Sequence, residues 1–207
     1  MHIMFVCTGN ICRSPMGELL LTRYLRGTSI RVSSAGTKGL AMHAIDSSAK
    51  RIMDSIGIDS SGFRSRRLTR SMVQTADLVL CFEQEQRKSI VTLVPTAVRY
   101  TFLLGDFANM CEYCAQRGLI KGTTIQERLQ SVVAQSSMVR PMLPDSQDIE
   151  DPHKKEFEKY HAAAEATNAG IRRILASMRK HYQVEHAPER RLVGSGNRGN
   201  YDSEYTK

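Results

Sequence analysis

The chain begins with a short apolar run that is followed by a polar turn and then by a helical pattern. Residues 3–6 are continuously apolar, which is typical of a strand buried on both faces of a parallel sheet. Residues 7–13 form a polar turn with one glycine, and Ser14 and Pro15 then suggest an N-cap and a first-turn proline. Apolar positions in residues 16–25 recur at helical spacing, so we expect a strand, a loop and a helix.

The same alternation continues through residue 104. The pattern predicts further strands at residues 30–34, 78–82 and 100–104, and helices at residues 46–56, 68–75 and 83–93. Strands that alternate with helices indicate an α/β fold around a parallel sheet. We therefore expect a single α/β domain with a four-stranded parallel sheet and helices on both faces.

The pattern changes in the second half of the chain. Residues 105–147 contain no convincing strand and include one predicted helix, at residues 124–135. A long helix is predicted after Pro152. The last stretch, residues 183–207, is rich in glycine and poor in large aliphatic side chains, so we expect a disordered tail. The predicted domain is thus residues 1–182, with an insertion at about 108–147.

The amino-acid composition limits the classes of protein to which this chain can belong. The 207 residues are 41% hydrophobic and include no run long enough to span a bilayer, so we expect no membrane insertion. The start of the chain lacks a basic region and a cleavage site, and the five scattered cysteines favour reduced thiols, so we expect a cytoplasmic location. The net charge of +8 favours anionic ligands. Nucleic acid has no further support, because tryptophan and RNA-binding aromatic patterns are absent.

The first loop carries the clearest chemistry. It places a thiol at Cys7 and a guanidinium at Arg13 between a strand and a helix. Inward-pointing amides at a helix N-terminus favour a tetrahedral oxyanion, and an arginine can hold two of its oxygens. The same groups stabilise a negatively charged sulfur, which is a nucleophile for phosphoryl transfer. We therefore expect phosphate to be bound by the following loop residues: Thr8, Gly9, Asn10, Ile11, Cys12 and Ser14.

Residues 7–15 resemble the signature loop C-x5-R-[ST] of the low-molecular-weight protein tyrosine phosphatases. Weaker similarities to that family occur at residues 34–37, 64–68, 76–81 and 151–152. The resemblance covers roughly residues 1–107 and 148–180. The long stretch from 109 to 147 is similar to the longer bacterial members of the family.

The resemblance implies a mechanism for phosphotyrosine hydrolysis. Cys7 would form a cysteinyl-phosphate, Arg13 would clamp the phosphate, and Asp151 would act as general acid and then as general base. It implies no cofactor and no metal for the reaction, because Arg13 and the loop amides supply the positive potential. The residues alone do not single out Asp151 among its acidic neighbours Asp145, Asp148 and Glu150. The implied partner is a tyrosine-phosphorylated protein, with a bacterial tyrosine kinase as a candidate.

The chain departs from the family at the walls of the expected substrate slot. His153 and Lys154 stand where an aromatic residue is common after the Asp-Pro pair, and Ala44 stands in place of a frequent proline. Ile11 favours phosphotyrosine, since relatives that hydrolyse phosphoarginine carry threonine at the matching position. A basic wall at 153–154 would attract acidic residues that flank a phosphotyrosine.

The other cysteines leave alternatives open. Cys12 could form a reversible disulfide with Cys7, whereas Cys81 is expected in the core. Cys111 and Cys114 have C-x2-C spacing without a second pair, so we interpret them as ordinary loop cysteines. Two other functions remain: a thioredoxin-coupled arsenate reductase, which shares this fold and loop, and a phosphotyrosine-binding module without turnover.

Overall fold

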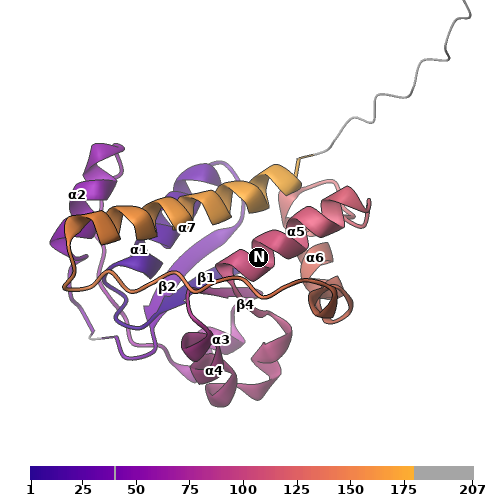
Figure 1. The fold of residues 1–207 in the computed structure, drawn as a ribbon, viewed down its shortest axis with the longest axis horizontal. Coiled ribbons are helices and arrows are strands. Elements are labelled where there is room, and N and C mark those ends of the chain that lie inside the picture. Colours follow the sequence, from indigo (N-terminus) through magenta and orange to yellow (C-terminus); the bar gives the residue numbers. More distant parts are fainter. Residues whose placement is uncertain (40, 180–207) are drawn as a thin grey trace, which may run out of the picture.

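The computed structural model describes residues 1–39 and 41–179, and its sheet confirms the predicted α/β class. The strands are β1 (His2–Cys7), β2 (Arg31–Gly36), β3 (Leu78–Cys81) and β4 (Thr101–Leu103). They pair in the order β2-β1-β3-β4, and every pair is parallel (Figure 1). Each predicted strand is present, with ends that differ by a residue or two.

The central strand β1 explains the arrangement of the core. All six of its residues are buried, and successive side chains point to opposite faces of the sheet. Ile3 and Phe5 belong to one apolar cluster, whereas Met4 and Val6 belong to the other. A strand that pairs on both sides and packs on both faces has no solvated surface, which is why residues 3–6 are all apolar.

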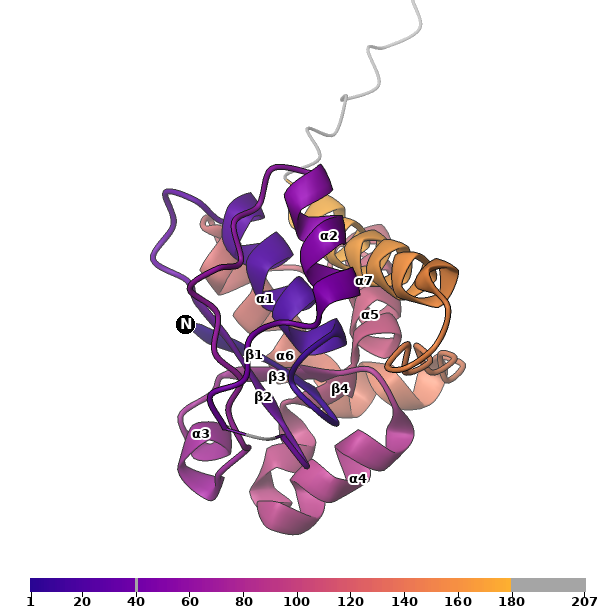
Figure 2. The same ribbon diagram turned by 90° about the vertical axis from the view of Figure 1, so that its left-hand side faces the viewer.

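Helices cover both faces of the sheet (Figures 1 and 2). One face carries α1 (Arg13–Tyr24), α2 (Ser47–Ser55), α5 (Leu104–Gln116) and α7 (Phe157–Ser177), with α6 (Ile125–Val139) beside α5. The other face carries α3 (Arg70–Gln74), α4 (Gln84–Leu93) and the 3-10 turn η1 (Pro95–Arg99). A second 3-10 turn, η2 (Arg140–Met142), follows α6. Among the described residues, no helix is both long enough and apolar enough to cross a bilayer.

The start of α1 corrects one prediction. The helix begins at Arg13 with Cys12 at its N-cap position, so Ser14 is not the N-cap. Asn10 adopts a left-handed conformation with φ of 56°, which turns the chain before Cys12. The helix therefore starts at Arg13, one residue earlier than Ser14. The hydroxyl of Ser14 is thereby free to approach the sulfur of Cys7.

The segment from 105 to 147 also differs from the prediction. It contains no strand, as expected, but α5 was not predicted, and α6 runs four residues beyond the expected end at 135. The interpretation of Cys111 and Cys114 as loop cysteines is wrong, because both are fully buried on α5 within the core. Together with Phe107 they form an apolar stripe at spacings of three and four. The predicted tail, residues 183–207, lies outside the described residues.

Candidate active site

The loop of residues 8–12, called the phosphate loop after the ligand that the sequence predicts for it, wraps around the sulfur of Cys7. β1 ends at Cys7 and α1 begins at Arg13, so residues 8–12 close a tight turn above the end of the central strand. The backbone N–H of Asn10 donates to Cys7 Sγ at 3.2 Å, and Ser14 Oγ lies 2.9 Å from the same sulfur. A buried sulfur with these polar contacts, near the N-terminus of a helix, is well placed to carry negative charge.

The side chain of Asn10 sets the shape of this loop. Its Nδ2 donates to Ser14 Oγ at 2.9 Å and to Ser34 Oγ at 2.8 Å, and its Oδ1 accepts from the backbone N–H of Arg66 at 2.7 Å. Ser34 in turn donates to Glu18 Oε2 at 2.6 Å, and burial raises the pKa of Glu18. Hydrogen bonds therefore run from α1 through β2 to the loop of residues 8–12 and hold its strained conformation.

Arg13 is a buried cation with acidic neighbours on two sides. Its side chain is only 1% exposed, and it lies over the ring of Phe82 at 5.9 Å. Nη1 is 3.0 Å from Glu83 Oε1 and donates to the carbonyl of Ile149 at 2.8 Å, and Nη2 is 2.7 Å from Asp151 Oδ2. Nε is buried without a hydrogen-bond acceptor within the described residues, so the guanidinium retains a donor for an anion.

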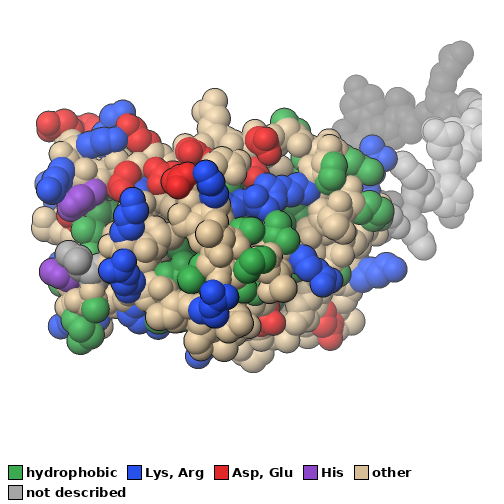
Figure 3. Space-filling view, turned by 90° about the horizontal axis from the view of Figure 1, so that it is seen from below, with side chains coloured by type: hydrophobic (Ala, Val, Ile, Leu, Met, Phe, Trp, Pro, Cys, Tyr) green, Lys and Arg blue, Asp and Glu red, His purple; other side chains and the backbone are tan. Residues whose placement is uncertain are grey.

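A cavity of about 220 Å³ opens over the loop. The residues that line it are Cys7, Thr8, Gly9, Ile11, Cys12, Lys38, His43, Asp151 and His153. Three of the lining side chains, from Lys38, His43 and His153, are basic or become cationic on protonation. Figure 3 shows Lys and Arg side chains spread along one face of the molecule, with histidines at its left end. The cavity suits a phosphate ester.

The structure brings the predicted residues Cys7, Arg13 and Asp151 together and separates Asp151 from its acidic neighbours. Asp148 Oδ1 accepts from the backbone N–H of Gln84 at 3.0 Å, so this carboxylate is used at the start of α4. Glu150 is exposed and pairs with lysine side chains. Of the four acidic residues in this segment, Asp151 alone lines the cavity.

The remaining predicted residues also lie in the loop. Thr8 Oγ1 accepts from Gln86 Nε2 at 3.2 Å, and the carbonyl of Ile11 accepts from the backbone N–H of Asp46 at 2.9 Å. His153 lines the cavity, whereas Lys154 is exposed beside it, so only half of the expected basic wall faces the site. Neither residue begins the last helix, which starts at Phe157.

Sequence reasoning missed Glu83 and the carbonyl of Ile149, both of which contact Arg13. The position of Glu83 in the sequence could have indicated this contact. Glu83 lies two residues after the end of β3, and β3 is the direct neighbour of β1 in the sheet. The carboxyl ends of parallel strands meet at one edge, so an acidic residue there faces the loop that follows β1.

Gly36 at the end of β2 allows the loop to pack against the sheet. An added Cβ would lie 2.7 Å from the carbonyl oxygen of Thr8 and 2.9 Å from the backbone nitrogen of Asn10. Gly36→Ala should therefore displace the loop and weaken inorganic phosphate binding at least about tenfold, measured by calorimetry, at a cost of about 1–3 kcal/mol of stability. Gly62→Ala is the matched control, because its Cβ would meet no atom within 4 Å. Equal phosphate affinity in the two variants would show that this contact does not shape the loop.

Comparison with known proteins places the site in a family. The family model for low molecular weight phosphotyrosine protein phosphatase matches residues 2–116. The chain is 38% identical over 110 residues to the low molecular weight protein-tyrosine-phosphatase Etp of Escherichia coli K12, covering 53% of this chain and 73% of that protein. It is 39% identical over 106 residues to the phosphatase Ptp of Acinetobacter johnsonii, covering 51% and 73%.

Solved structures agree with this assignment. The tyrosine phosphatase Wzb from Escherichia coli K30, in complex with sulphate, superposes with a TM-score of 0.64 at 26% identity, covering 86% of this chain and 98% of that one. The YwlE arginine phosphatase from Geobacillus stearothermophilus superposes with a TM-score of 0.63 at 29% identity, covering 86% and 92%. The family match includes Cys7, Arg13 and Glu83 but ends before Asp151. The chain belongs to the low-molecular-weight phosphotyrosine protein phosphatase family.

Proposed function

We propose that the protein hydrolyses phosphotyrosine in proteins through a cysteinyl-phosphate on Cys7. The observation that carries this proposal is the surrounding of the Cys7 sulfur, which accepts from the backbone N–H of Asn10 and lies beside Ser14 Oγ. At the end of the same loop, Arg13 Nε is buried without a hydrogen-bond acceptor among the described residues. A loop that only bound phosphate would not need a thiol at its base. Family membership supports the same reaction class.

In the first step, Cys7 Sγ attacks phosphorus while the bond from phosphorus to the tyrosine oxygen breaks. Asp151 gives its proton to the leaving phenolate, and Arg13 with the loop N–H groups stabilises the equatorial oxygens. In the second step, Asp151 accepts a proton from water, the water oxygen attacks phosphorus, and the S–P bond breaks. Ser14 Oγ, 2.9 Å from the sulfur, can donate to the departing thiolate. Inorganic phosphate and tyrosine are the products.

Before substrate binds, Asp151 and Arg13 neutralise each other. Asp151 Oδ2 is 2.7 Å from Nη2, and the Asp151 side chain is 39% exposed at the edge of the cavity. A phosphate dianion offers the guanidinium a stronger partner. We propose that the phosphate takes over Nη2. The released Asp151 carboxylate then takes up a proton from solvent and moves to the leaving oxygen, where it can act as the acid.

The arsenate reductase alternative needs further thiols that can reach Cys7. Cys81, Cys111 and Cys114 are buried in the core, and burial raises the pKa of Cys81 to about 12. Only Cys12 shares the cavity with Cys7. This arrangement does not favour a relay of three thiols, which supports hydrolysis over arsenate reduction.

The cellular context is a further part of the proposal. All five cysteines are free and buried, which is typical of a protein in a reducing compartment such as the cytoplasm. We also propose that residues 1–182 act as one phosphatase unit and that the substrate is a tyrosine-phosphorylated protein, with a bacterial tyrosine kinase as the first candidate. Cys7→Ser protein, which keeps the loop but lacks the nucleophile, should retain the phosphorylated kinase in a binding assay.

A comparison of phosphopeptides tests the substrate class. Because Ile11 presents an apolar side chain to the cavity, kcat/KM for a phosphotyrosine peptide should exceed the values for phosphoarginine and phosphoserine peptides at least about 100-fold, a difference of about 2.7 kcal/mol. Cys7→Ser should lower kcat by at least about 10⁴-fold. Preference for phosphoarginine would contradict the assignment, and turnover no faster than that of Cys7→Ser would favour the binding module.

Substitution of Asp151 tests the general acid. Asp151→Asn should lower kcat/KM for phenyl phosphate, which reports the first step alone, by about 10²–10⁴-fold, because phenolate is a poor leaving group that needs a proton. The loss should be much smaller for para-nitrophenyl phosphate. Asp148→Asn is the matched control, and it should leave the ratio of the two substrates unchanged, since Asp148 is used at the start of α4. The opposite pattern would assign the acid to Asp148.

Cys7 and Cys12 line the same cavity, which supports redox control of the enzyme. With a chelator present, mild peroxide should inactivate the protein through a Cys7–Cys12 disulfide, and a thiol reductant should restore activity. Peptide mapping should identify that pair. Cys12→Ser protein should recover less activity, because Cys7 then proceeds to irreversible oxidation states. Equal recovery would leave Cys12 without this protective role.

A further inference from the structure

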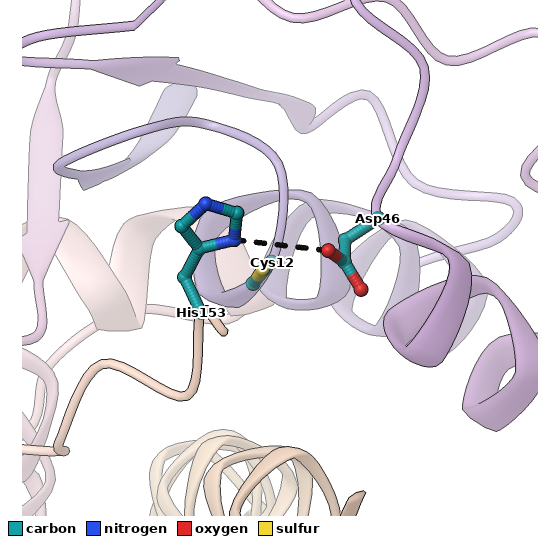
Figure 4. Close-up of side chains that lie close together, drawn as sticks. All are labelled: Cys12, Asp46 and His153. Carbon is teal, nitrogen blue, oxygen red and sulfur yellow. Dashed lines mark ion pairs between the residues drawn. The ribbon is translucent and has the colours of Figure 1, made fainter. Parts of the chain in front are cut away.

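Three chemically different side chains converge beside the cavity from separate parts of the chain. Cys12 stands at the N-cap of α1, Asp46 at the N-cap of α2, and His153 in the loop before α7. Figure 4 shows that they point toward one another. One ligand atom from each lies within 4.8 Å of the others, and His153 Nδ1 is 3.7 Å from Asp46 Oδ2.

These three residues match the requirements of one kind of cation. Thiolate, imidazole and carboxylate are the ligands of Zn²⁺, whereas Mg²⁺ and Ca²⁺ select oxygen. Zinc bonds of about 2.0–2.3 Å in a tetrahedron place a nitrogen and an oxygen donor roughly 3.3–3.5 Å apart, and a sulfur roughly 3.5–3.7 Å from either. The His153–Asp46 separation exceeds that range by only a few tenths of an ångström, and the other separations need to shorten by at most about 1.3 Å.

The surrounding contacts hold the carboxylate in place. Asp46 Oδ1 accepts from the backbone N–H of Ser48 at 2.9 Å, and Asp46 Oδ2 accepts from the hydroxyl of Tyr160 at 3.3 Å. The Tyr160 oxygen also accepts from the backbone N–H of Lys154 at 3.2 Å, so one buried side chain joins Asp46 to the loop that carries His153. Burial raises the pKa of Tyr160 to about 12, so its hydroxyl remains a donor. Partners that orient metal ligands in this way are a common feature of metal sites.

We propose that Cys12, Asp46 and His153 form a binding site for Zn²⁺ at the wall of the active-site cavity. The ion replaces the thiol proton of Cys12, forms an S–Zn bond and releases one proton to solvent. Because Cys12 and His153 line the cavity, a water molecule from the cavity can complete the coordination.

The site links the metal to activity without placing it in the reaction. Cys12 belongs to the phosphate loop, and His153 lies two residues after Asp151, whose Oδ1 accepts from the backbone N–H of His153 at 3.2 Å. A bound ion joins the loop to the Asp151 segment, which holds the general acid beside Arg13 and narrows the cavity. Zn²⁺ therefore acts as a reversible inhibitor. The binding itself does not rest on the proposed function.

Cobalt is the spectroscopic probe for this site. Reduced full-length protein without an affinity tag should bind Co²⁺ with a sulfur-to-cobalt charge-transfer band and the intense visible bands of tetrahedral coordination. Cys7→Ser should keep these bands, and Cys12→Ser should lose the charge-transfer band. Persistence in Cys12→Ser with loss in Cys7→Ser would overturn the proposal, because the ion would then bind the nucleophile. Absence of the bands from the wild-type protein would overturn it as well.

Calorimetry with Zn²⁺ tests the other two ligands. His153→Ala should weaken Zn²⁺ binding at least about 100-fold, and Asp46→Asn at least about tenfold. His161→Ala is the matched control: His161 is an exposed histidine 3.5 Å from the carboxylate of Glu165, and its loss should leave the affinity unchanged. Zn²⁺ should also inhibit wild-type turnover, and a chelator should reverse the inhibition. Equal affinity of wild-type and His153→Ala protein would overturn the site, and full turnover with Zn²⁺ bound would overturn the inhibitory role.

Discussion

The burial of Arg13 is the constraint on which the rest of the site depends. A guanidinium that is 1% exposed loses nearly all of its hydration, which costs several kcal/mol unless other groups compensate. Glu83, Asp151 and the carbonyl of Ile149 provide that compensation from two directions. Glu83 follows β3, the strand next to β1, whereas Ile149 and Asp151 belong to the segment before α7. In the proposed reaction a phosphate dianion replaces Asp151, so the electrostatic requirement that orders these side chains also favours a phosphate ester as substrate.

Much of this arrangement was predictable from local patterns. The apolar run at residues 3–6, the thiol and guanidinium of the loop, and the alternation of strands and helices predicted the sheet and the position of the phosphate loop. Each of these features is determined by residues that are close together in the sequence, so the pattern of apolar and polar positions is enough to predict it. The choice of Asp151 among its acidic neighbours depended on family resemblance, and the structure separates these carboxylates by what each one contacts.

The features that were missed depend on longer-range packing. Ser14 looks like a helix N-cap until the left-handed Asn10 draws the helix start back to Arg13. Cys111 and Cys114 looked like loop residues because the burial of α5 arises from its contacts with α7, far along the chain. The cluster of Cys12, Asp46 and His153 spans more than 140 positions, so its proximity could not be read from spacing.

The central claim is that Cys7 becomes covalently phosphorylated, and a rapid acid quench tests it most directly. Asp151→Asn protein should be mixed with para-nitrophenyl phosphate, because the activated leaving group departs readily while water attack loses its general base. The account predicts a burst of para-nitrophenol and, in the digested protein, a phosphocysteine at position 7. Product release without a burst, together with no phosphate on Cys7, would mean that water attacks the ester directly and would contradict the account.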